Sequence, residues 1–257
     1  MPERTSYEPG TPSWVDLATP DLDGAKRFYG SLFGWEAQNA GPPEETGGYA
    51  FFLLDGRRVA GVSPLMTEGW PTVWSTYVAT DDADAVAQRA AAAGATLLAE
   101  PMDIMDAGRM TFLLHPAGGA IGAWQPGQHT GAELVNDPGT FTWSELHTHD
   151  VDGAKAIGAA VFGWTYDAQD FGEMTYTVVQ VGDAGVAGMV PLPGDVPEEV
   201  PASWMTYFAV DDCDAAVARV EELGGSVLLR PMDVAGVGRF AVAADPYGAQ
   251  FGVIKNA

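Results

Sequence analysis

Residues 141–164 read FTWSELHTHDVDGAKAIGAAVFGW, and residues 12–35 read PSWVDLATPDLDGAKRFYGSLFGW. Eleven residues recur at a constant offset of 129 positions: Trp14, Leu17, Thr19, Asp21, Asp23, Gly24, Ala25, Lys26, Phe33, Gly34 and Trp35. An internal repeat of this length predicts two structurally equivalent halves. Residues common to both copies are expected to serve the fold. Residues found in one copy, above all Glu145, His147 and His149, are where function is to be sought.

Each copy predicts a strand followed by a helix. Residues 14–19 alternate between two faces, which is the period of a strand. Pro20 ends that strand, Asp21 or Asp23 is a suitable helix cap, and Gly34 is a suitable helix end. Strand, helix and three strands then recur twice in each half. The polar arm 1–11 is expected to be loosely held.

Composition limits the classes of function. The 257 residues are 47% apolar, enough for two ordinary cores. A formal net charge of −23 argues against nucleic acid and against an anionic membrane surface as partners. Plain solubility or a cationic small molecule fits this charge. The single cysteine, Cys213, excludes an intramolecular disulfide and is typical of the reducing cytoplasm. No apolar run is long enough to span a membrane.

Several motifs together resemble the vicinal oxygen chelate superfamily, which includes glyoxalase I, bleomycin-resistance proteins and extradiol dioxygenases. They are Thr19-Pro20-Asp21-Leu22-Asp23 before a helix ending in Phe33-Gly34-Trp35, Asp211-Asp212-Cys213-Asp214, and Asp245-Pro246-Tyr247-Gly248. The resemblance implies an α+β fold of two tandem glyoxalase-like domains. Each domain would consist of two βαβββ modules, forming a cupped, mainly antiparallel sheet with helices outside. The predicted units are an N-terminal domain 1–126, a linker 127–140 and a C-terminal domain 141–257.

The family's metal ligands can be carried over only by position. The first-strand histidine falls on Trp14 and Trp143, and the last-strand glutamate falls on Gly122 and Gly252. The fifth-strand ligand falls near Ser75 and Met205. Tryptophan, methionine and glycine offer no charged or imidazole donor, so neither a metal nor another cofactor is expected at these positions.

Aromatic and acidic residues are predicted to line the two cups instead. Alternation places Trp14, Asp16, Tyr77 and Trp124 on the first cup and Trp143, Glu145 and Tyr207 on the second. His147 and His149 follow Glu145 at two-residue spacing and are expected on the same face. The alternative is that Glu145 and His147 hold a divalent metal, or that the aromatic residues only fill a core.

Arg109 and Arg239 recur in the two halves, as do Asp103 and Asp233. We expect Arg–Asp pairs that pin a loop.

Two hypotheses of different classes follow, beside a third reading in which two packed domains without a cavity act through their surfaces. The leading one is a protein that binds a bulky planar aromatic small molecule, cationic in one version, in a resistance, sequestration or biosynthesis-helper role. The other is an enzyme of the isomerase, lyase or hydroxylase-like type that uses Glu145 and His147, with or without a divalent metal. A monomer and a homodimer both agree with the sequence.

Overall fold

The computed structural model of the chain describes residues 3–67, 69–171 and 174–257. The first half contains β1 (Pro12–Thr19), α1 (Leu22–Phe33), β2 (Glu36–Asn39), α2 (Pro43–Thr46), β3 (Ala50–Leu54), β4 (Arg57–Pro64), β5 (Val73–Ala79), α3 (Ala83–Ala92), β6 (Thr96–Ile104), β7 (Gly108–His115) and β8 (Gly119–Pro126). The second half contains β9 (Phe141–Thr148), α4 (Val151–Phe162), β10 (Thr165–Phe171), β11 (Met174–Val181), β12 (Ala184–Pro191), β13 (Ser203–Ala209), α5 (Cys213–Glu222), β14 (Ser226–Val234), β15 (Gly238–Ala244) and β16 (Gln250–Asn256).

The strands form two eight-stranded sheets with the same order. The first runs β2-β3-β4-β1-β5-β8-β7-β6 and the second runs β10-β11-β12-β9-β13-β16-β15-β14. Four pairs are parallel, namely β1 with β4, β5 with β8, β9 with β12 and β13 with β16. The remaining pairs are antiparallel, so the fold class that the family resemblance implied is confirmed.

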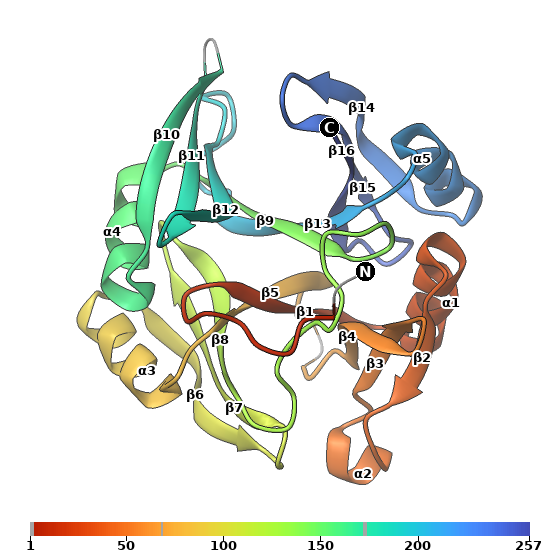
Figure 1. The fold of residues 1–257 in the computed structure, drawn as a ribbon, viewed down its shortest axis with the longest axis horizontal. Coiled ribbons are helices and arrows are strands. Elements are labelled where there is room, and N and C mark those ends of the chain that lie inside the picture. Colours follow the sequence, from red (N-terminus) through yellow and green to blue (C-terminus); the bar gives the residue numbers. More distant parts are fainter. Residues whose placement is uncertain (1–2, 68, 172–173) are drawn as a thin grey trace.

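Each sheet bends into a U, and the two U shapes stand back to back (Figure 1). The base of the first is β1 with β5, and the base of the second is β9 with β13. A buried hydrogen bond joins the bases, with Thr76 Oγ1 2.9 Å from Ser144 Oγ. We call the concave face of the first sheet cup 1 and that of the second sheet cup 2.

Helices α1, α3, α4 and α5 cover the convex faces, with α3 beside α4 and α1 beside α5 (Figure 1). Each buried core therefore combines residues of both halves. In one core Phe28 and Phe33 of α1 join Phe208 and Phe251 of the second sheet. In the other, Val86 of α3 joins helix α4. Both cores contain residues from before and after the linker, so the cores do not separate the two predicted domains. The domain limits drawn from the sequence remain a prediction.

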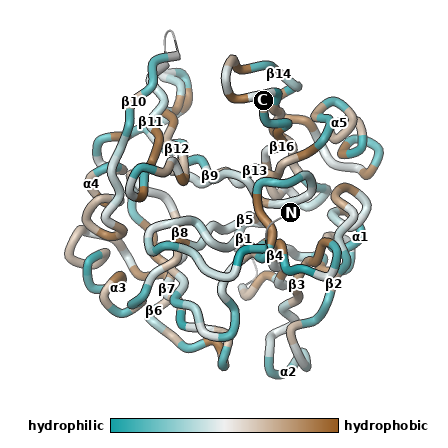
Figure 2. Tube along the Cα trace, in the orientation of Figure 1, coloured by the Kyte–Doolittle hydropathy of each residue, from teal (hydrophilic) through white to brown (hydrophobic). Residues whose placement is uncertain are grey.

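Local sequence explains where the helices begin and end. Asp21, Asp82, Asp150 and Asp212 each accept a hydrogen bond from the backbone N–H three residues on, which satisfies one of the free donors of the first turn. Gly34 and its repeat partner Gly163 end α1 and α4 in the left-handed region. Figure 2 shows apolar and polar residues alternating along α1, α3 and α5, whereas α4 is mostly apolar.

The expectation of a loosely held N-terminal arm is wrong for residues 3–11, the described part of the arm, because backbone and side-chain hydrogen bonds fix it. The Tyr7 hydroxyl donates to the carbonyl of Ala132 at 2.6 Å, and Arg4 N donates to the carbonyl of Glu133. Trp164 Nε1 donates to the carbonyl of Gly10 at 2.7 Å. The arm thus ties the linker and the second half to the first sheet.

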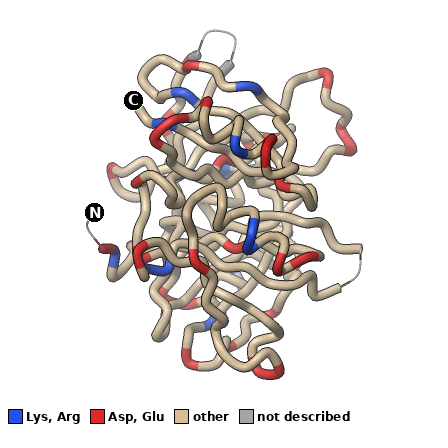
Figure 3. The backbone as a smooth tube through the Cα atoms, turned by 90° about the vertical axis from the view of Figure 1, so that its right-hand side faces the viewer, with Lys and Arg blue, Asp and Glu red and all other residues tan. Residues whose placement is uncertain are grey.

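Acidic residues occur along the backbone of both halves (Figure 3), and the sequence has 35 acidic against 12 basic residues. Within the described ranges, no helix combines the length and the apolar character needed to cross a membrane.

Candidate functional site

The floor of each cup is set by strand alternation. On β9, Trp143, Glu145 and His147 face cup 2, whereas Ser144 and Leu146 are fully buried on the other face. On β1, Trp14 and Asp16 occupy the same places in cup 1. The side chains of Glu145 and His147 are 14% and 29% exposed, so solvent reaches both from the cup.

Cup 1 contains a chain of hydrogen bonds that ends on a carboxylate. Trp14 Nε1 donates to the hydroxyl of Tyr49 at 2.9 Å, and that hydroxyl donates to Asp16 Oδ2 at 3.2 Å. Tyr77 also hydrogen-bonds to Asp16. Burial raises the pKa of Asp16 to about 7, although the two tyrosine hydroxyls act in the opposite direction by stabilising the ionised form.

Cup 2 repeats this chain and adds a histidine. Trp143 Nε1 donates to the hydroxyl of Tyr176 at 2.8 Å, and Tyr176 hydrogen-bonds to Glu145. The Tyr207 hydroxyl donates to Glu145 Oε1 at 3.1 Å, and His147 Nε2 lies 2.9 Å from the same oxygen. Burial, and then the charge of Glu145, hold the pKa of both tyrosines well above the usual range, so both hydroxyls stay protonated donors.

Glycines make room for these tyrosines. A Cβ on Gly122 would overlap the ring of Tyr77, and a Cβ on Gly252 would overlap the ring of Tyr207. The family's metal-binding glutamate would stand at these two glycines, so its place is taken by an aromatic ring. Among the described residues, no three His, Cys, Asp or Glu side chains are placed to hold a metal ion. The residues at these positions do not fit the family's metal.

The linker distinguishes the two cups. His129 is 6% exposed, and its ring meets the edge of Trp14 with the ring centres 4.3 Å apart. Phe51 and Trp124 flank it at 5.5 and 5.6 Å, and Trp124 Nε1 donates to the His129 carbonyl. Burial, and then the positive charge of Arg58, lower the pKa of His129 to about 4, so the ring is neutral near pH 7. The linker therefore fills part of cup 1 with its own side chain.

In cup 2, Trp143 is half-buried, whereas its counterpart Trp14 in cup 1 is 3% exposed. One wall of cup 2 also leaves large apolar side chains open to solvent. Met232, which is 43% exposed, pairs across the strands with Phe240, and Leu229 pairs with Val242. Phe240 in turn meets the ring of Tyr207. Cross-strand partners lie on the same face, so this wall continues from the floor.

Removal of the His129 ring is expected to destabilise the protein modestly. His129→Ala leaves a void between three aromatic rings, but it also removes His129 Nε2, a buried atom with no hydrogen-bond partner among the described residues. These effects oppose each other, and we expect a net loss of about 1–2 kcal/mol in the free energy of unfolding. Urea denaturation with and without millimolar imidazole measures the loss and its partial rescue. The exposed His149→Ala is the control, and wild-type stability in His129→Ala would contradict the packing argument.

The other predicted site residues are placed as follows. Trp124 lies against the linker at the rim of cup 1, and the Tyr77 ring meets Phe112 there. His149 follows the end of β9, is exposed, and its Nε2 lies 3.1 Å from the Pro197 carbonyl. The structure thus brings Trp143, Glu145, His147 and Tyr207 together, but not His149.

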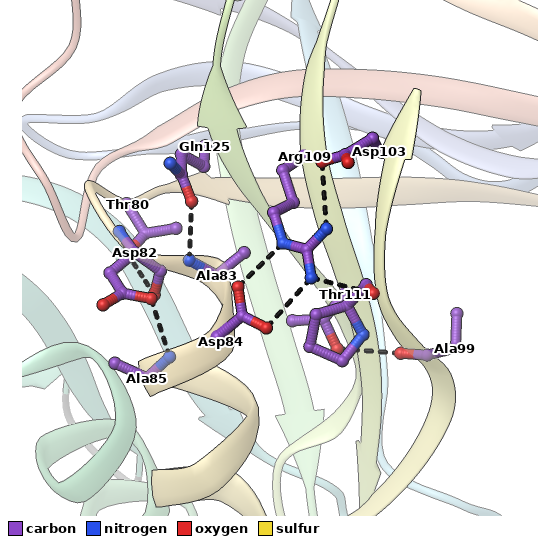
Figure 4. A network of polar contacts seen from close by, with 11 residues as sticks. Thr80, Asp82, Ala83, Asp84, Ala85, Ala99, Asp103, Arg109, Thr111 and Gln125 are labelled. Atoms are coloured by element: carbon purple, nitrogen blue, oxygen red, sulfur yellow. Dashed lines mark hydrogen bonds and ion pairs between the residues drawn. The ribbon is translucent and has the colours of Figure 1, made fainter. Parts of the chain in front are cut away.

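The predicted Arg–Asp pairs are confirmed. Arg109 contacts Asp84 with two nitrogens and Asp103 with a third, so it joins the start of α3 to β6 (Figure 4). Arg239 repeats this arrangement with Asp214 and Asp233. These exposed networks hold α3 on the first sheet and α5 on the second sheet.

Cys213 is fully buried at the start of α5. Burial raises the pKa of its thiol to about 11. It is therefore a core residue rather than a reactive one.

Three site residues were not predicted from the sequence, namely Tyr49, Tyr176 and His129. Tyr49 and Tyr176 each stand twelve positions before a glycine, Gly61 and Gly188, whose missing Cβ makes room for the tyrosine hydroxyl. This shared spacing is a signal that could have revealed them. Nothing in the local sequence around His129 reveals that it packs in cup 1.

Comparison with known proteins agrees with the architecture. A family model described as the Glyoxalase/Bleomycin resistance protein/Dioxygenase superfamily matches residues 11–144, and a glyoxalase-like domain model matches residues 145–254. A protein of Mycobacterium tuberculosis called "Putative glyoxylase CFP32" is 44% identical over 100% of this chain and 99% of its own length. The anthracycline biosynthesis protein DnrV of Streptomyces peucetius is 38% identical over 98% of this chain and 95% of its own.

Solved structures share the fold at low sequence identity. The Mn(II)-bound glyoxalase of Novosphingobium aromaticivorans has a TM-score of 0.65 at 17% identity, covering 97% of this chain and 84% of that one. The 2,3-dioxygenase LapB of Pseudomonas sp. KL28 has a TM-score of 0.66 at 13% identity, covering 96% and 92%.

Proposed function

Within the glyoxalase/bleomycin resistance protein/dioxygenase superfamily, to which this chain belongs, we propose that the protein binds a bulky planar aromatic small molecule in cup 2. The role would be biosynthesis of such a compound, resistance to it or its sequestration. The observation that carries the proposal is the combination of an aromatic floor, a solvent-exposed apolar wall and one oriented polar cluster. Exposed apolar surface beside a few fixed polar groups is typical of a ligand site.

The two sides of cup 2 differ in a way that suits such a ligand. Phe240, Met232 and Leu229 offer apolar contact on one wall, and Asp167 and Gln169 are exposed on the opposite edge strand. Aromatic contacts contribute roughly 0.5–1.5 kcal/mol each beyond the burial of area. The relationship to DnrV supports a role near such compounds, since its name refers to anthracycline biosynthesis.

Tryptophan fluorescence with a neutral anthraquinone as quencher tests the choice of cup. Glu145→Gln is expected to weaken binding by about tenfold or more, which is about 1.4 kcal/mol or more, because the carboxylate holds His147 and both tyrosines in place. Asp16→Asn, the matched change in cup 1, is expected to leave the affinity at the wild-type value. The reverse pattern would mean that cup 1 is the site.

One contact favours an enzyme as the second candidate. His147 Nε2 lies 2.9 Å from Glu145 Oε1, and a histidine oriented by a carboxylate is a common general base. In this candidate, ligand turnover is lost in His147→Ala while quenching by the ligand persists. Turnover that needs added metal would support the metal-dependent version.

A further inference from the structure

Glu145 is already occupied by donors from its own chain. Its carboxylate accepts from Tyr207 and lies 2.9 Å from His147 Nε2, and Tyr176 hydrogen-bonds to it as well. A carboxylate has about four acceptor positions, so three donors leave it little capacity for a ligand. A cationic amine would have to give up its water for a carboxylate whose charge is already shared among three partners.

The contact with Glu145 decides which nitrogen of His147 is free. An ionised carboxylate only accepts hydrogen bonds, so His147 Nε2 carries the proton. In the neutral ring Nδ1 then holds a lone pair and is an acceptor. No described residue donates to Nδ1, and the side chain is 29% exposed on the cup face. Cup 2 therefore presents a free acceptor, Nδ1 of His147. The carboxylate oxygens of Glu145 beside it already accept hydrogen bonds from the protein's own donors.

Resting on the proposed function of cup 2, we propose that its ligand is a phenol, a planar aromatic compound whose ring hydroxyl donates a hydrogen bond to Nδ1 of His147. The apolar wall of Phe240 and Met232 accounts for the ring system, and the unpaired acceptor accounts for the hydroxyl. Glu145 is then a positioning residue that fixes the tautomer of His147 and makes no contact with the ligand. The first cup lacks this acceptor, since Ala18 occupies the place of His147.

The test compares two ligands that differ in one hydrogen-bond donor, a β-hydroxyanthraquinone and its methyl ether. Both are titrated against the full-length protein by tryptophan quenching. The wild-type protein is expected to prefer the hydroxyl compound by about tenfold, the worth of one hydrogen bond of about 1.4 kcal/mol. His147→Phe is expected to abolish the preference by weakening the hydroxyl compound alone, and Glu198→Gln in the exposed loop after β12 is expected to retain it.

Each other outcome has a definite meaning. Equal affinity of the wild-type protein for the two ligands, or a preference that survives in His147→Phe, overturns the assignment of the phenol. An aminomethyl analogue that binds better than the ether, with the advantage kept in His147→Phe and lost in Glu145→Gln, would show that Glu145 contacts the ligand after all. Failure of both anthraquinones to quench the wild-type protein would overturn the proposed function itself, and this inference with it.

Discussion

At pH 8 the Asp16→Asn variant is expected to be more stable than the wild-type protein by up to roughly 4 kcal/mol, and near pH 4 the two are expected to be equally stable. Burial raises the pKa of Asp16 to about 7 in the folded chain, against a value near 4 in the unfolded chain. At pH values between about 4 and about 7, Asp16 is protonated in the folded state and ionised in the unfolded state. Stability therefore falls as pH rises from about 4 to about 7, and the asparagine removes that fall.

Urea denaturation at several pH values between 4 and 8 measures the difference, in which the contributions of the other carboxylates cancel. Tyr49→Phe gives the complementary result. It removes a hydroxyl that stabilises the ionised carboxylate, so it is expected to steepen the fall in stability. Parallel curves for the wild-type protein and Asp16→Asn would show that Asp16 is well solvated.

Gly252→Glu, which restores the acidic residue typical of the family's metal sites, is expected to cost roughly 3–5 kcal/mol of stability and to create no metal site. A Cβ at this position overlaps the ring of Tyr207, and Phe251 and Val253 on either side are fully buried. The new carboxylate would stand beside Glu145 without a cation. Urea denaturation with and without Mn²⁺ or Zn²⁺ measures both effects.

Gly194→Ala is the control for the glycine itself, since a Cβ there meets nothing within 4 Å, and it is expected to stay within about 0.5 kcal/mol of wild type. Removing the ring in the double variant Tyr207→Ala/Gly252→Glu is expected to relieve part of the loss. A stable Gly252→Glu protein that binds a divalent metal tightly would show that the residues of cup 2 do fit the family's metal.

The repeat made the equivalence of the two halves predictable, because equal residues at a constant offset imply equal local structure; the fold itself was expected from the family resemblance. The period of two placed Trp14, Asp16, Trp143 and Glu145 on the cup faces correctly. The same period wrongly placed His149 on the face of cup 2. Strand β9 ends at Thr148, and the His149 side chain lies against the carbonyl of Pro197 in a loop. Strand alternation predicts a side chain's face only as far as the strand continues.

The rule that shared residues serve the fold was too simple at the site. Both cups hold a carboxylate with a tryptophan and two tyrosines, so the shared part belongs to the candidate site as well. Tyr49 and Tyr176 were missed because their offset is 127 rather than 129 positions. The position of His129 depends on how the linker crosses the first sheet, which no local pattern encodes.

The pairing of helices across the two halves has a consequence for synthesis. Helix α1 covers its apolar face with residues of α5 and β16, close to 190 positions later in the chain. At 5–20 residues per second, translation needs on the order of ten seconds or more to supply them. During that interval Phe28 and Phe33 lack their partners Phe208 and Phe251. The nascent first half therefore leaves the apolar face of α1 uncovered until residues 208–251 have been synthesised.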